Sequence, residues 1–410
     1  MYLINTRTLQ LKDFLEGKQE SYVILSHTWG NEEVSFQDLE RYHTDQSFAE
    51  ALSLREGFKK ITHCCETAFE EGFDWAWIDT CCINKTSSTE LSEAINSMFK
   101  WYEQSAVCYA FLADVLDTRE DLAGHDSSFR RSRWFTRGWT LQELLAPKHL
   151  RFYNQWWEVL GQMTAEPELC NVVSDITTIQ PDCLDKKTAI SEVCVAKRMS
   201  WASRRETTRK EDIAYCLLGI FGVNMPLLYG EGPRAFIRLQ KEIINNTNDY
   251  SILAWGTLIL GSQYPSNQGQ CQDPLALSPD MFKDCYDFEV RFRAKTRIQW
   301  TSDGIQAGLV LRRDSGSFSA GLNCFSWRFP LHIISIVIDP QRAVGATTTE
   351  VEVRRMSDYL FVSHPYFGKY YATTILNASA TTALRIYRGA LLHLHGAKSE
   401  IAIKIPEGHI

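Results

Sequence analysis

The sequence lacks the segments that mark exported and membrane proteins. Residues 1–17 contain no basic start followed by an apolar run, so no secretory signal is expected. The longest apolar stretch, residues 213–229, is interrupted by two glycines, an asparagine and a proline, which favours a buried helix and turn over a membrane span. The chain is therefore predicted to stay in the cytosol or nucleus, with a cytoplasmic location and no membrane partner.

An excess of basic charge is also missing. The 410 residues include 43 lysines and arginines against 50 aspartates and glutamates, which gives a formal net charge of −7. A chain with this balance has no general attraction for phosphate backbones or anionic lipid. Nucleic acid is therefore not expected among its partners.

Metal-binding cysteine spacings are absent, although the chain has 12 cysteines. The adjacent pairs Cys64-Cys65 and Cys81-Cys82 do not have the spacing of two to four residues that lets paired thiolates reach one zinc ion. Without an export signal, the cysteines are expected to be reduced and packed as small apolar residues. A glycine-rich phosphate loop is missing too. The glycine pair Gly230 and Gly232 is not a candidate, because it follows no predicted strand. No metal site is predicted.

What is present is an alternation of strand-like and helix-like segments over the first 155 residues, which is typical of an α/β domain with a mostly parallel sheet. The predicted strands are 21–25, 75–79, 107–112 and 149–153. The predicted helices are 54–71, a segment capped by Ser88 or Thr89, and 132–145.

The rest of the chain changes character twice. Residues 171–246 have a helical pattern, and the mixed charges of residues 203–212 favour a solvated helix start over an anion site. Beyond residue 250 the pattern changes to short alternating or β-branched runs, which predict a β-rich, sandwich-like domain. The predicted domains are 1–170, 171–250 and 251–410.

Polar loops follow the predicted strands of the α/β domain. In an open α/β sheet, ligands bind outside the carboxyl ends of the strands. The sequence therefore predicts a polar crevice where the loop after the first strand, Asp79 after the second strand, and Glu143 on the helix 132–145 converge. The first of these loops consists of Ser26, His27, Thr28, Trp29 and Gly30.

Each of these residues also has a structural interpretation. Glu143 shares a helix face with Trp139 and Thr140 among apolar neighbours, and spacing alone favours a surface carboxylate over a partly buried functional one. His27 could be a turn residue, Trp29 a core anchor and Asp79 the cap of a turn. A thiol of the Cys81-Cys82 pair could act as a nucleophile with His27, but thiols at the end of a buried strand usually serve packing.

Three long blocks of sequence resemble the signature blocks of the fungal heterokaryon incompatibility (HET) domain family. They are residues 21–30 (SYVILSHTWG), 77–85 (WIDTCCINK) and 137–147 (RGWTLQELLAP), in order and in register. The resemblance extends through residues 200–206 and 214–232, so that it covers about the first 255 residues, and only loosely the β-rich remainder.

This resemblance implies a fold and an activity. The HET family is associated with non-self recognition and regulated cell death in filamentous fungi, and its domain is thought to be related to Toll/interleukin receptor (TIR) domains. Those domains have a flavodoxin-like fold, and many cleave NAD at the nicotinamide glycosidic bond. Residues 139–144 look like the Trp-x-Leu-x-Glu-Leu helix that bears the catalytic glutamate of plant TIR domains, which makes Glu143 the catalytic candidate. Thr140 stands where those domains often have cysteine, and the His-Thr-Trp-Gly loop of residues 27–30 is not theirs.

The resulting hypothesis is a NAD glycohydrolase that needs no cofactor or metal. The residues predicted to bind the nucleotide substrate are Ser26, His27, Thr28, Trp29, Gly30, Asp79, Cys82 and Trp139. One alternative is a non-enzymatic death-signalling module that assembles as a homo-oligomer or with a partner signalling protein. Another is an enzyme that acts on a different small molecule in secondary metabolism.

Overall fold

The computed structural model divides the chain into two compact units, residues 1–190 with 205–228, and residues 191–204 with 229–410. Each unit is described by itself. The predicted domain boundaries at residues 170 and 250 stay predictions. The described residues are 1–15, 20–117, 121–260, 275–290, 298–301, 304–314, 317–327, 333–342, 350–363, 370–376, 385–387 and 403–404.

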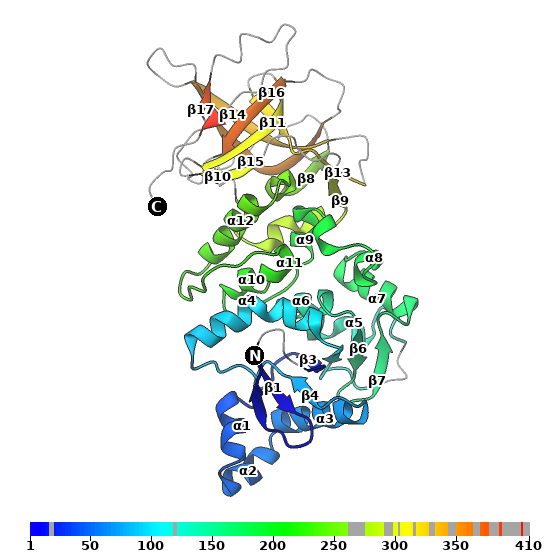
Figure 1. Ribbon diagram of the computed structural model, residues 1–410. Coiled ribbons are helices and arrows are strands. Elements are labelled where there is room, and N and C mark those ends of the chain that lie inside the picture. The colour runs from blue at the N-terminus through cyan, green and yellow to red at the C-terminus, as the bar shows by residue number, and fades with distance from the viewer. Residues whose placement is uncertain are drawn as a thin grey trace. The chain divides into compact units, whose positions relative to one another are not determined.

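The first unit is built on a seven-stranded sheet (Figure 1). Its strands are β1 (Tyr2–Asn5), β2 (Leu11–Asp13), β3 (Val23–His27), β4 (Trp75–Trp77), β5 (Val107–Phe111), β6 (Leu150–Tyr153) and β7 (Val159–Gln162). Their order across the sheet is β2-β1-β4-β3-β5-β6-β7. The four central strands β4, β3, β5 and β6 are parallel, and β1, β2 and β7 add antiparallel edges. The predicted α/β class with a mostly parallel sheet is confirmed.

The order of the parallel strands indicates where a ligand would bind. In chain order they are the second, first, third and fourth strands, which is the order of flavodoxin-like sheets. The direction of winding reverses between β3 and β5, and ligands of such sheets bind at this reversal, outside the carboxyl ends of the strands. Every residue of β3 and β5 is buried, as expected for central parallel strands covered on both faces.

Helices cover both faces of this sheet. The helices of the first unit are α1 (Phe36–Tyr42), α2 (Gln46–Ser53), α3 (Glu56–Glu70), α4 (Ser88–Gln104), α5 (Ser128–Arg131), α6 (Thr140–Leu145), α7 (Pro167–Thr177), α8 (Pro181–Leu184), α10 (Asp212–Tyr215) and α11 (Leu218–Phe221), with a 3-10 helix η1 (Arg133–Thr136). Figure 1 shows α3 on one side of the sheet and α4 with α6 on the other. The residues of β3 that alternate between the two faces therefore meet different helices.

The prediction of one continuous helix over residues 132–145 is wrong. The segment consists of η1 and α6, preceded by α5, because the backbone of Arg137 is extended and the amide of Gly138 donates a hydrogen bond of 2.8 Å to the carbonyl oxygen of Glu206 instead of continuing the helix. The Ser132 hydroxyl accepts a hydrogen bond from the amide of Trp134, and it donates one of 2.6 Å to Asp114 at the end of the third parallel strand. Within the predicted helical region 171–246, residues 212–221 form two short helices, α10 and α11. The strands β1, β2 and β7 were not predicted, since three or four residues carry too little alternation to be recognised.

The second unit contains the predicted β-rich region, and this part of the fold prediction is confirmed. Its helices are α9 (Val195–Ser200) and α12 (Arg234–Asn246), with 3-10 helices η3 (Tyr250–Leu253) and η4 (Pro279–Cys285); η2 (Ile190–Glu192) lies at the junction of the units. Its strands are β8 (Thr257–Leu260), β9 (Phe288–Val290), β10 (Gln299–Thr301), β11 (Gly304–Asp314), β12 (Ser317–Gly321), β13 (Cys324–Ser326), β14 (Ile333–Arg342), β15 (Glu350–Ser363), β16 (Tyr370–Leu376), β17 (Arg385–Tyr387) and β18 (Ile403–Lys404). Nine of these strands form one sheet, in which only the β8–β15 pair is parallel, and β9 pairs with β13.

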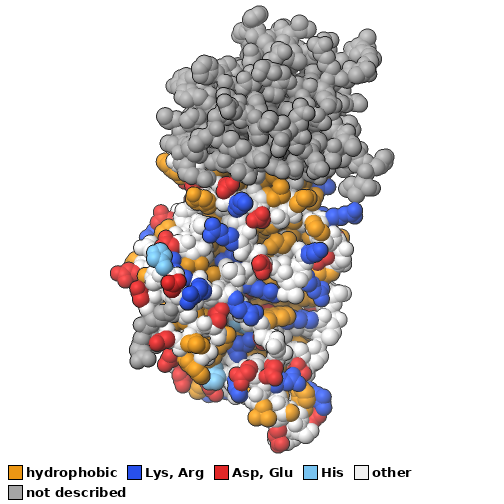
Figure 2. All heavy atoms as spheres, turned by 180° about the vertical axis from the view of Figure 1, so that it is seen from behind, with side chains coloured by type: hydrophobic (Ala, Val, Ile, Leu, Met, Phe, Trp, Pro, Cys, Tyr) orange, Lys and Arg blue, Asp and Glu red, His pale blue; other side chains and the backbone are white. Residues whose placement is uncertain are grey.

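The described surface has mixed charge. On the face shown in Figure 2, acidic and basic side chains of the described residues are interspersed. Within the described ranges, no helix is long and apolar enough to cross a membrane. The 11 cysteines that the structure describes are buried free thiols.

A close backbone contact joins α3 to the loop after β3. A Cβ atom added to Gly57 would lie 2.2 Å from the carbonyl oxygen of Glu32 and 2.9 Å from the Cα atom of Glu33. Real Cβ atoms do not approach backbone so closely, so glycine is required for the first turn of α3 to rest on this loop. The contact fixes the position of Glu33, which belongs to the candidate site.

Replacing Gly57 by alanine should therefore push this loop away from α3. We expect Gly57→Ala to lower the free energy of unfolding by roughly 1–3 kcal/mol, the usual cost of overpacking. The exposed Glu66 on the same helix offers a control, and Glu66→Ala should change it by less than about 0.5 kcal/mol. Chemical denaturation of both variants measures the difference, and equal stabilities would contradict the contact.

Candidate functional site

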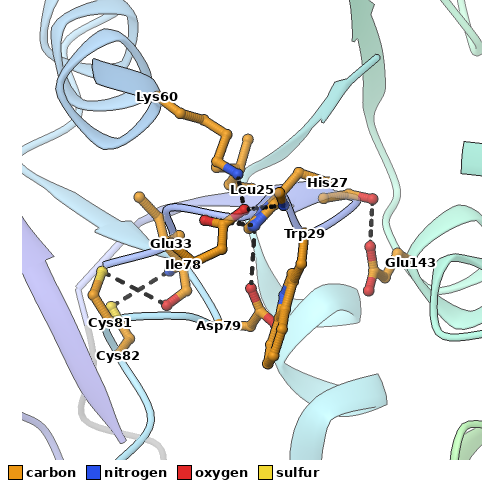
Figure 3. Close-up of polar contacts among 12 residues, drawn as sticks. Leu25, His27, Trp29, Glu33, Lys60, Ile78, Asp79, Cys81, Cys82 and Glu143 are labelled. Carbon is orange, nitrogen blue, oxygen red and sulfur yellow. Dashed lines mark hydrogen bonds and ion pairs between the residues drawn. The ribbon is translucent and has the colours of Figure 1, made fainter. Parts of the chain in front are cut away.

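Two groups of polar side chains meet at the carboxyl end of β3. Ser26 and His27 are the last two residues of this strand, and successive side chains of a strand point to opposite faces of the sheet. Ser26 faces α6, where it meets Glu143. His27 faces the side of α3, where it meets Glu33 (Figure 3). We call these groups the Ser26 cluster (Ser26, Tyr102, Trp134 and Glu143) and the His27 cluster (His27, Trp29, Glu33, Lys60 and Asp79).

A hydrogen bond between Ser26 and Glu143 forms the centre of the Ser26 cluster. The Ser26 hydroxyl donates to Oε2 of Glu143 and accepts a hydrogen bond of 2.8 Å from the indole of Trp134. Glu143 is only 7% exposed, and Ser26 and Trp134 are completely buried. The interpretation of Glu143 as a surface carboxylate, which spacing alone favoured, is therefore wrong. It failed because all six residues of α6 are buried, so this helix has no solvent face.

Burial determines the protonation of Glu143. Desolvation raises the pKa of this carboxyl from its ordinary value of 4.5 to about 8, and the charge of Asp79 adds to the rise. The hydrogen bond from Ser26 acts in the opposite direction and lowers the pKa, as do Tyr102 and the guanidinium of Arg205. The carboxyl is thus mainly protonated at neutral pH and lies within reach of ionisation by a small change in its surroundings.

Arg205 holds the start of α6. Its guanidinium donates hydrogen bonds of 2.9 Å to the carbonyl oxygen of Arg137 and to the hydroxyl of Thr140, the first residue of α6. Arg205 is only 6% exposed, so the expectation that residues 203–212 form a solvated segment is wrong at this position. Desolvation lowers the pKa of Arg205 to about 10. Nothing in the local pattern distinguishes Arg205 from the other three basic residues of that run.

The His27 cluster is a chain of charged and polar groups, shown in Figure 3. Lys60 on α3 donates to Oε1 of Glu33 at 2.5 Å, and Oε2 of Glu33 lies 3.8 Å from Nε2 of His27. The same nitrogen lies 3.7 Å from Oδ1 of Asp79, whose Oδ2 accepts a hydrogen bond of 2.8 Å from the indole of Trp29. This series of groups runs from the half-buried ammonium group of Lys60 to Trp29, which is 44% exposed.

Burial keeps His27 neutral. Desolvation is the main cause that lowers its pKa well below the ordinary value of 6.5, and Lys60 and Lys85 lower it further. Desolvation also raises the pKa of Asp79. The sequence predicts His27, Trp29 and Asp79 as site residues but not Glu33 and Lys60, because nothing in the local patterns of the last two distinguishes them from surface charges.

The other predicted binding residues are more dispersed. Thr28 is buried, and the amide of the exposed Gly30 donates 2.7 Å to Oε1 of Glu33. Trp139 precedes α6, and its indole lies 3.4 Å from Oδ2 of Asp212 rather than in the Ser26 cluster. The structure therefore gathers most of the predicted loop, together with Asp79, around His27.

The cysteines after β4 contact the backbone. The Cys82 sulfur accepts a hydrogen bond of 3.4 Å from the amide of Ile78, and the Cys81 sulfur lies 3.9 Å from the Ile78 carbonyl oxygen. The hydrogen bond with Cys82, followed by desolvation, raises the pKa of the Cys81 thiol well above 9.0, which disfavours the thiolate that a nucleophile requires. Cys82 also lines a cavity of about 350 Å³ together with Tyr2, Phe14 and Trp101. Within the described ranges, no group of three or more His, Cys, Asp or Glu side chains could hold a metal ion.

Comparisons with known proteins agree with the resemblance seen in the sequence. Residues 22–127 match the sequence profile of the family described as heterokaryon incompatibility protein (HET), and residues 234–296 match a domain of unknown function (DUF8212). The chain is 44% identical over 238 residues to the vegetative incompatibility protein HET-E-1 of Podospora anserina, an alignment that covers 57% of this chain and 17% of that protein. No solved structure matches the chain. The HET profile includes Ser26, His27 and Asp79 and ends before Glu143.

The protonation of Glu143 makes stability depend on pH. Between 4.5, where this side chain ionises in the unfolded chain, and about 8, the folded protein holds a proton that the unfolded chain has lost. The free energy of unfolding should therefore fall as the pH rises through this range, by about 1.4 kcal/mol for each pH unit that separates the two pKa values. Glu143→Gln cannot ionise and should lack this loss. Urea unfolding of both proteins at about pH 5 and about pH 8 tests the expectation, and parallel changes would contradict it.

Proposed function

We propose that this chain, whose residues 22–127 match the heterokaryon incompatibility profile, acts in fungal non-self recognition by cleaving NAD at the nicotinamide glycosidic bond. Support for the biological role comes from the relative whose name describes vegetative incompatibility. That protein is much longer, and the alignment covers 17% of it, so its role as a whole is carried over to this chain as part of the proposal.

The observation that carries the chemical proposal is the buried Ser26–Glu143 hydrogen bond beside the reversal of strand order. Glu143 is the one acidic residue of α6, and it meets the end of β3, the strand next to that reversal. A carboxyl group whose pKa is strongly shifted by burial, at the position where such sheets bind ligands, is a candidate for catalysis. The resemblance of residues 139–144 to the catalytic helix of plant TIR domains selects the same side chain.

The reaction needs stabilisation of positive charge on a ribose. When the bond between C1′ and the pyridinium nitrogen breaks, its electron pair leaves with nicotinamide, which becomes neutral, and the ribose acquires oxocarbenium character. An ionised Glu143 would stabilise that charge, as a carboxylate does in glycoside hydrolysis. Water then adds to C1′ and releases a proton, which gives ADP-ribose. Ser26 and Trp134 would hold the carboxylate in place, because their hydrogen bonds link it to β3 and η1.

Nicotinamide release from NAD by the purified full chain tests this proposal. We expect Glu143→Gln to lower the rate by roughly 100-fold or more, the usual loss when a group that stabilises transition-state charge is removed. Glu56→Gln is the matched control. The Glu56 side chain is 78% exposed and, among the described residues, forms an ion pair only with Lys59. Equal release by the Glu143 and Glu56 variants would remove Glu143 from the mechanism. Absence of release from the unsubstituted chain at any concentration would instead favour a non-enzymatic signalling module.

The pH dependence of the same reaction is a separate prediction. Because the ionised form of Glu143 is the active one in this mechanism, kcat/KM should rise with pH and level off above about 8, the pKa to which burial raises this carboxyl. Ser26→Ala removes a hydrogen bond that lowers that pKa, so its profile should shift to higher pH. A rate that falls through the same range would show that the protonated form acts.

A further inference from the structure

Three polar atoms of the His27 cluster converge without hydrogen bonds between them. Nε2 of His27 lies 3.7 Å from Oδ1 of Asp79 and 3.8 Å from Oε2 of Glu33, distances that are too long for a hydrogen bond. Both ring nitrogens of His27, and Oε2 of Glu33, are buried and have no hydrogen-bond partner in the described part of the chain. Unpaired buried polar atoms are rare because each costs free energy. The cluster therefore has unused capacity to bind a polar group.

Most of the polar atoms that are free to bind a ligand here are hydrogen-bond acceptors. An ionised carboxylate accepts hydrogen bonds and donates none. Glu33 uses one oxygen for Lys60 and Asp79 uses one for Trp29, and the second oxygen of each carboxylate is turned toward His27. The Asp79 side chain is 23% exposed and the Glu33 side chain 14%, so the cluster reaches the surface through Asp79. A hydroxyl group, which can donate and accept, is complementary to such a site, and a phosphate group, which presents acceptors, is not.

The exposed neighbour of Asp79 is an aromatic ring in a fixed position. The Trp29 indole donates to Asp79, and the ammonium of Lys85 lies 3.9 Å from the ring centroid, while the backbone carbonyl oxygen of Trp29 accepts a hydrogen bond of 3.0 Å from Arg133. An exposed ring held by such contacts loses little entropy when a flat ligand stacks on the face opposite Lys85. Bases stack on tryptophan in many nucleotide-binding proteins. Trp29 and Asp79 thus offer a base platform beside a ribose acceptor.

We infer that the His27 cluster binds the adenosine part of the dinucleotide, with the ribose hydroxyls on Asp79 and Glu33 and the adenine on Trp29, and that the two carboxylates reject a 2′-phosphate. The inference rests on the proposed function, which places the nicotinamide ribose at Glu143. His27 lies behind both carboxylates and is a positioning residue. The chain should accordingly select NAD over NADP, which differ only in the 2′-phosphate.

Calorimetric titration of the full-length Glu143→Gln variant with NAD and with NADP tests this selectivity without turnover. We expect NAD to bind about tenfold or more tightly than NADP, because like charges placed side by side in a site are costly. Adding Asp79→Asn keeps an oxygen for the Trp29 indole and supplies an amide donor, so the preference should fall to about threefold or less. Adding Glu56→Gln instead should leave it unchanged. The melting temperature of each variant in the absence of nucleotide shows whether it is folded.

The outcomes separate this inference from the proposed reaction. Selective binding of NAD by the Glu143→Gln variant supports the inference even if the unsubstituted chain releases no nicotinamide, in which case the reaction alone is contradicted. Equal binding of NAD and NADP overturns the inference even if nicotinamide is released. Absence of binding by either nucleotide overturns it as well, and a preference that survives Asp79→Asn in a folded protein removes Asp79 from the selection.

Discussion

A hydrogen bond from a serine hydroxyl to a buried carboxyl group is the constraint on which the candidate site depends. Ser26 ends the first parallel strand, and Glu143 lies on a helix of six residues that is too short to be stable alone. Contacts at both ends hold this helix. Arg205 binds the hydroxyl of its first residue, and the ammonium of Lys186 donates to the carbonyl oxygen of Leu145, its last residue. The buried carboxyl can exist only because strand and helix are fixed in this way.

The same strand end connects the two clusters. Ser26 and His27 are neighbours in sequence but point to opposite faces of the sheet, so one strand presents a carboxyl group on one side and an imidazole between two carboxylates on the other. Asp79 acts on both sides, because it faces His27 and its charge also raises the pKa of Glu143. A ligand that changes the charge or solvation of Asp79 would therefore also change the ionisation of Glu143. Under the proposed function, ligand binding at Asp79 and the reactivity of Glu143 would be coupled electrostatically.

Buried ionisable groups are costly, and the surrounding structure shows how this cost is offset. Glu33 is paired with Lys60, and Gly57 lets α3 come close enough to place that lysine. Arg205 donates to two oxygen atoms but keeps one terminal nitrogen buried without a hydrogen-bond partner among the described residues. Together with the unpaired nitrogens of His27, this leaves polar capacity in the site that a fully satisfied core would not have.

The sequence by itself determined the alternation of strands and helices, the α/β class, the β-rich character of the later region and the polar loops that carry Ser26, His27 and Asp79. These features follow from local patterns of apolar residues and from turn signals, which act over a few positions. The sequence could not determine that Glu143 is buried, that Arg205 binds the first residue of its helix, or that Glu33 and Lys60 join His27. Ser26 and Glu143 are 117 positions apart, and Arg205 is 65 positions from Thr140. Only the tertiary structure brings such residues together, and it decides which charged side chains lose their water.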